Sequence, residues 1–141
     1  MLRVREDGEP ARAHFEAMVK RFAGTAHRGH FIYWQANALE HSKRRDEALA
    51  LFRAWGAEAG QSTVALAYQA DFMVHHAIPG AVEVARAHHT IEPSAESHYV
   101  LSKALVQAGE PAAAIEHARA AVAQAPTAAL FANHLRDLGG L

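Results

Sequence analysis

Histidine is the residue type in this chain whose number and spacing could support chemistry. The sequence holds 11 histidines and no cysteine. Imidazole binds zinc, copper or nickel, but a metal site needs three or four ligands that converge on one point. Neighbouring residues on a helix point about 100° apart, so an adjacent pair rarely chelates one ion through both rings. The weak candidates for metal ligands are two such pairs, His75, His76 and His88, His89.

These histidines also have a simpler structural explanation. Both adjacent pairs fall near the expected C-terminal ends of helices, where the helix dipole favours cationic side chains. The sequence His-Glu-x-x-His, which places two zinc ligands on one helical face, is absent. We therefore expect no metal site and no cofactor. A histidine-dependent metal-binding protein, or one that responds to metal or pH, is the alternative function.

The patterns of common catalytic sites are absent as well. The sequence contains no P-loop, no dinucleotide-binding fingerprint and no Gly-x-Ser-x-Gly elbow. Without cysteine there is no thiol nucleophile, and no serine and histidine are arranged as nucleophile and base. We expect that the chain is not an enzyme. A small all-α enzyme, or a regulatory subunit of a larger one, is the third class of function considered.

Charge and hydropathy argue against a nucleic-acid partner and a membrane partner. The formal net charge is −1, and the longest basic run, Lys43-Arg44-Arg45, falls in a predicted turn. Nucleic-acid binding needs a larger basic patch, so we expect no nucleic-acid partner. No apolar run approaches the roughly 20 residues of a membrane helix, and the N-terminus lacks the apolar segment of a signal peptide. The sequence predicts a cytoplasmic protein without a membrane partner.

Helical periodicity dominates the chain and must position all of these residues. Apolar side chains recur at steps of three and four, and alternation typical of strands is nearly absent. Turns rich in Pro and Gly separate the periodic segments, and Ser94 suits the N-cap of one helix. The pattern predicts an all-α stack of antiparallel helical hairpins. The eight expected helices cover residues 10–24, 29–41, 46–55, 62–75, 81–89, 94–107, 111–124 and 127–138.

Three alanines reveal an internal repeat. Ala48, Ala81 and Ala114 are spaced 33 residues apart, and each lies early in the second helix of a predicted hairpin. A fixed period in this range is typical of stacked helical hairpins. A methyl side chain at this position lets the two helices of a hairpin approach closely, because a larger group would overpack the contact.

Residues 94–126 resemble a tetratricopeptide repeat (TPR) through Leu101, Ala104, Leu105, Gly109, Ala114, Ile115, Ala121 and Pro126. Residues 29–61 and 62–93 resemble it more weakly, because Trp55, Asp71 and His88 stand where the family usually has small residues. The resemblance implies a single TPR-like domain over residues 1–141, wound as a short right-handed superhelix. A flanking helix at 10–24 would precede the three repeats, and a capping helix at 127–138 would follow them.

The resemblance also implies a binding surface. In TPR arrays the first helix of each hairpin lines a concave groove, so we expect a protein–protein interaction module or adaptor that binds a peptide or partner protein there. The terminal helices offer surface for a homo-oligomer. Carried over by register, the groove residues are His30, Tyr33, Asn37, Glu40, Leu66, Met73, Glu96, Tyr99, Lys103 and Gln107.

Overall fold

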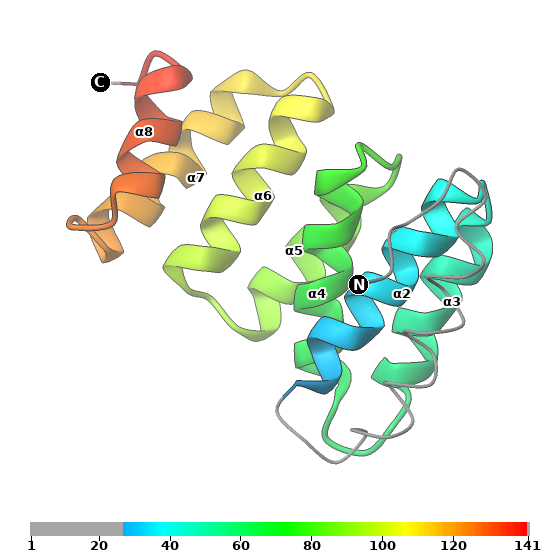
Figure 1. The fold of residues 1–141 in the computed structure, drawn as a ribbon. Helices are drawn as coiled ribbons and strands as arrows, with labels where there is room; N and C mark the ends of the chain where they lie inside the picture. Colours follow the sequence, from blue (N-terminus) through cyan, green and yellow to red (C-terminus); the bar gives the residue numbers. More distant parts are fainter. Residues whose placement is uncertain (1–26, 141) are drawn as a thin grey trace. The chain divides into compact units, whose positions relative to one another are not determined.

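The computed structural model describes residues 27–140, which form helices joined by short turns (Figure 1). No strand occurs among these residues, so the predicted all-α class is confirmed. None of these helices has both the length and the apolar content that a membrane crossing demands. The predicted helix at 10–24 lies outside the described residues. The helices are α2 (Arg28–His41), α3 (Arg45–Gly56), α4 (Ser62–His75), α5 (Ala81–Ile91), α6 (Ala95–Gln107), α7 (Pro111–Gln124) and α8 (Ala129–Asp137).

The chain divides into two compact units, Met1–Gln69 and Ala70–Leu141. The division falls inside α4, and therefore inside the predicted repeat at 62–93. Each unit contains large buried apolar side chains of its own, such as Phe52 in the first and Leu101 in the second. The first unit holds α2, α3 and the start of α4, and the second holds the end of α4 together with α5 to α8.

The three alanines of the 33-residue spacing are buried. Ala48, Ala81 and Ala114 lie at or near the first turns of α3, α5 and α7. Within the first unit α2 packs against α3, and within the second α6 packs against α7. Small side chains suit such close contacts between helices, since added bulk would force the backbones apart.

Trp55 is buried in the first unit although the TPR pattern has a small residue at its position. Its exposed fraction is 3%. Gly29 on α2 makes room for it, because a Cβ at residue 29 would lie 2.8 Å from Tyr68 Cζ and 3.0 Å from Trp55 Cη2. Trp55 Nε1 donates a hydrogen bond to Gln61 Oε1 at 2.9 Å, so the polar atom of the indole is paired. The bulk of Trp55 is thus balanced by a glycine on the facing helix.

Serine side chains cap the start of α6, which confirms the predicted N-cap. Ser97 N donates to Ser94 Oγ at 3.0 Å, and Ser94 N donates to Ser97 Oγ at 2.8 Å. Such a capping box satisfies two backbone amides that the helix itself leaves without partners. At the other end of α6, Gly109 adopts a positive φ of 80°, which allows the chain to reverse into α7.

Candidate functional site

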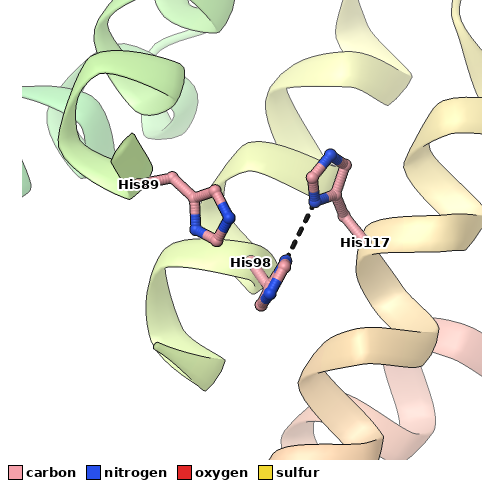
Figure 2. Close-up of side chains that lie close together, drawn as sticks. All are labelled: His89, His98 and His117. Atoms are coloured by element: carbon pink, nitrogen blue, oxygen red, sulfur yellow. Dashed lines mark hydrogen bonds between the residues drawn. The ribbon is translucent and has the colours of Figure 1, made fainter. Parts of the chain in front are cut away.

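The second unit brings three histidines together. His89 lies on α5, His98 on α6 and His117 on α7, and Figure 2 shows their rings turned toward one another. One ring nitrogen from each histidine lies within 4.8 Å of the other two. Each side chain is partly buried. Among residues 27–140 this is the one group of three or more side chains found that could hold a metal ion.

Helix packing positions these rings. His89 lies near the end of α5 and His98 near the start of α6, on the two sides of a short connection. The helix α6 packs against both α5 and α7, so His117 faces the same space from α7. The ring centroids of His89 and His98 are 4.1 Å apart, and that of His117 lies 5.2 Å from His98 and 5.6 Å from His89.

Hydrogen bonds define the protonation of the cluster. His98 Nδ1 and His117 Nδ1 are 2.9 Å apart, so one ring donates and the other accepts (Figure 2). The accepting imidazole must be neutral, since a charged ring only donates. His89 Nδ1 lies 2.7 Å from Ser97 Oγ, whose own hydrogen goes to Ser94 O at 3.0 Å. His89 Nδ1–H therefore donates to Ser97, and in the neutral ring the lone pair of His89 is on Nε2.

The surroundings lower the pKa of all three imidazoles. Burial, which disfavours the charged ring, is the largest cause in each case. Charge repulsion lowers the pKa further. It comes from His88 for His89, from His89 and His117 for His98, and from His89 and Arg86 for His117, where Glu116 acts in the opposite direction. Lowered pKa values favour the neutral imidazole at neutral pH, and this is the form that binds metals.

Of the four histidines nominated from the sequence, the cluster includes only His89. The side chain of His75 is exposed, and the ring of His76 lies 4.8 Å from it at an angle of 85°. The ring of His88 is buried, with Nε2 3.7 Å from Glu92 Oε1 and without a hydrogen-bond partner. Neither adjacent pair contributes both of its rings to a group of three possible ligands among residues 27–140.

The metal-ligand candidates nominated from the sequence did not include His98 or His117. One signal was available, because His89 and His98 flank the predicted turn at Pro93. A helix end and the start of the next helix must meet across so short a connection. No comparable signal pointed to His117, which joins the cluster only through the packing of α7 on α6.

A second serine and histidine pair resembles a nucleophile and its base, but the contacts contradict that role. Ser102 Oγ lies 2.8 Å from His134 Nε2. Ser102 is fully buried, and its hydroxyl donates to Ala114 O at 2.7 Å. The hydroxyl hydrogen is thus committed to a backbone carbonyl, so Ser102 accepts from His134. The pair ties α6, α7 and α8 together. Burial, with a further contribution from Lys103, lowers the pKa of His134.

Two predicted groove positions of the first unit, His30 and Tyr33, have their rings near the ring of Tyr68. The ring of Tyr68 lies 5.9 Å from that of His30 and 6.3 Å from that of Tyr33. Trp34, which the register did not nominate, is 45% exposed and its ring lies 6.4 Å from that of His30. His30 and Trp34 are four residues apart, about one helical turn, so this spacing could have placed Trp34 on the same helix face as His30. The other predicted positions of this unit, Asn37, Glu40 and Leu66, are partly exposed.

The predicted groove positions of the second unit are more polar. Lys103 Nζ lies 4.6 Å from the centroid of the Tyr99 ring, a distance at which the cation is attracted to the ring face. Gln107 Nε2 donates to Val74 O at 2.7 Å, so its amide joins α6 to the end of α4. Of the two remaining positions, Glu96 is exposed and Met73 is buried.

No protein-family model, no curated protein and no solved structure matches this chain. Membership of the TPR family therefore stays a prediction that rests on residues 94–126 and on the 33-residue spacing.

Proposed function

We propose that the chain is a protein-interaction module, an adaptor that binds a peptide or partner protein on the first helices of its TPR-like hairpins. The observation that carries this proposal is the burial of Ala48, Ala81 and Ala114 at a constant 33-residue spacing. Repeated helical hairpins stack to bury their apolar faces, and the extended surfaces that result serve mainly to bind partners.

In the first unit, α2 supplies the side chains suited to anchor a partner. Trp34 is a large apolar side chain with 45% exposure, and His30 and Tyr33 lie beside it on the same helix. Tryptophan and tyrosine are enriched among the residues that dominate binding energy, because they bury much area with few rotatable bonds. We expect an apolar side chain of the partner to cover Trp34.

In the second unit, α6 offers both charge and apolar surface. Lys103 is held above the Tyr99 ring, and Val106 is an exposed apolar side chain on the same helix. An acidic side chain of a partner can pair with Lys103 while aliphatic groups contact Val106. The proposed partner is therefore a peptide segment that carries both acidic and apolar residues.

Peptide selection tests this function. Peptides are selected from a random display library against the folded, tag-free chain, and the Kd of a selected peptide is measured by fluorescence anisotropy. Trp34→Ala is expected to cost about 2 kcal/mol, or roughly 30-fold in Kd. Lys103→Ala is expected to weaken acidic peptides and to reduce the salt dependence of their binding.

The matched control is Ile91→Ala. Ile91 is 56% exposed and lies on α5, which carries no predicted contact residue. Its substitution should leave the Kd unchanged, and circular dichroism should show that all variants fold. An equal loss of affinity in the Ile91 variant, or a library that yields no saturable binder, would contradict the proposed function.

A further inference from the structure

We propose that His89, His98 and His117 form a binding site for a divalent transition-metal ion, with zinc the best match, and that the ion joins three consecutive helices. None of these three histidines is among the residues proposed to contact the peptide, and the ion is a ligand that the adaptor function does not require. The evidence is the convergence of three ring nitrogens from α5, α6 and α7 (Figure 2).

The donor set selects the class of metal. All three ligands are imidazole nitrogens, which suit zinc, copper and nickel, whereas calcium and magnesium prefer oxygen. Zinc accepts three protein nitrogens and leaves its fourth tetrahedral position for water or another ligand. Burial lowers the pKa of all three imidazoles, which favours the neutral form that metal binding requires.

The spacing of the rings is close to that of a bound site. Zinc–nitrogen bonds of about 2.0–2.1 Å place tetrahedral ligands roughly 3.4 Å apart. One nitrogen from each ring lies within 4.8 Å of the other two, and His98 Nδ1 lies 2.9 Å from His117 Nδ1. For all three nitrogens to bind one ion, the rings must rotate about their side-chain torsions and move closer together.

Metal binding replaces one hydrogen bond of the cluster. The proton between His98 Nδ1 and His117 Nδ1 moves to the Nε2 of its own ring, or to solvent if that ring is charged. Both Nδ1 lone pairs then face the ion. His89 contributes Nε2, because its Nδ1–H is already held by Ser97.

Ser97 acts as a positioning residue for the site. Ligating histidines usually donate their second N–H to a fixed acceptor, which sets the tautomer and the direction of the free nitrogen. The buried hydroxyl of Ser97 fills this role for His89, and it is itself held by two hydrogen bonds to Ser94. The orientation of His89 is therefore prepared before any ion arrives.

Titration of the full-length, tag-free protein tests the site. Zn²⁺ is added in a calorimeter, and Co²⁺ is added as a spectroscopic probe of coordination number. We expect one equivalent of metal, the visible absorption bands of four-coordinate cobalt, and a higher Tm. His98→Gln and His117→Gln should each weaken Zn²⁺ binding by more than about 100-fold, beyond the effect of losing an outer-shell partner.

The control is the double variant His75→Gln, His76→Gln. It removes two of the 11 histidines from the same unit without touching the cluster, so its zinc affinity should equal that of the unchanged protein. No saturable binding up to about 1 mM Zn²⁺ would overturn the proposal. A loss of affinity in the control as large as in His98→Gln would overturn it as well.

A measurement on the unchanged protein covers the case in which a glutamine variant fails to fold. Imidazole ¹⁵N chemical shifts report directly which ring nitrogens bind an ion. Addition of Zn²⁺ should move the signals of His89, His98 and His117 by amounts typical of ligation. Ligation shifts in a different set of histidines would overturn the assignment.

Discussion

At the scale of single residues, Gly29 and Trp55 form a matched pair in the first unit. Trp55 is buried where the TPR pattern has a small residue. The extra space that its ring needs is provided by a glycine on the facing helix. The space is filled, because any Cβ at residue 29 would meet the rings of Tyr68 and Trp55. Close packing of this kind leaves no room for even one methyl group.

Gly29→Ala should therefore destabilise the protein. Alanine favours a helix over glycine by up to about 1 kcal/mol, but overpacking against two aromatic rings costs about 1–3 kcal/mol. We expect a net loss of about 1 kcal/mol in the free energy of unfolding, measured by urea denaturation.

The companion substitution is Gly56→Ala, at the end of α3. A Cβ there would meet only Ala65 Cβ, at an ordinary contact distance of 3.4 Å. Its stability should equal or slightly exceed that of the unchanged protein. Equal stability of the Gly29→Ala and Gly56→Ala proteins would contradict the close contact of Gly29 with Trp55 and Tyr68.

At the scale of elements, the start of α6 combines a helix cap with the orientation of a histidine. Ser97 Oγ accepts hydrogen bonds from Ser94 N and from His89 Nδ1, and donates one to Ser94 O. One hydrogen and two lone pairs are all that a hydroxyl offers, so Ser97 is saturated. The cap of α6 and the ring direction of His89 thus depend on the same atom.

Ser97→Ala should separate these two roles. Loss of the capping interaction is expected to cost about 1 kcal/mol of unfolding free energy. Loss of the acceptor for His89 Nδ1–H is expected to weaken Zn²⁺ binding by about tenfold or more. Urea denaturation and calorimetric titration measure the two effects on the same preparation.

Thr90→Ala provides the reference for Ser97→Ala. The Thr90 hydroxyl donates only to Arg86 O within α5, next to His89 in the chain. Its removal should change unfolding by less than about 0.5 kcal/mol and leave zinc affinity unchanged. Unaltered zinc affinity in a folded Ser97→Ala protein would show that Ser97 does not position His89.

At the scale of the whole molecule, the two units are expected to respond differently to metal. The histidine cluster lies entirely within Ala70–Leu141, and its three helices belong to two successive predicted repeats. A ligand that binds only the folded form stabilises the segments that must open to release it. Zinc should therefore act on the second unit.

Amide hydrogen exchange should reveal this difference. With free Zn²⁺ at 100 times its Kd, amides in α5, α6 and α7 that exchange by opening of the site should slow by up to about 100-fold. Amides in α2 and α3 of the first unit should exchange at unchanged rates. Equal protection of both units would contradict a site confined to α5, α6 and α7, as would unchanged exchange in those three helices.

Much of the helical architecture could be predicted because its causes are local. Apolar steps of three and four, together with turns at Pro79-Gly80 and Gly109, placed the helices close to their observed bounds. The N-cap at Ser94 was predicted for the same reason, since a capping side chain acts on amides only a few residues away.

By itself, the sequence determined the all-α class, the positions of the helices and the buried alanines that recur every 33 residues. Only the tertiary structure decided that Gly29 makes room for Trp55 and that His89, His98 and His117 converge. The physical reason is the distance along the sequence over which each interaction acts. Helix periodicity and capping depend on neighbours within a few residues, whereas a shared cavity or ligand set depends on how separate helices pack, which local spacing does not encode.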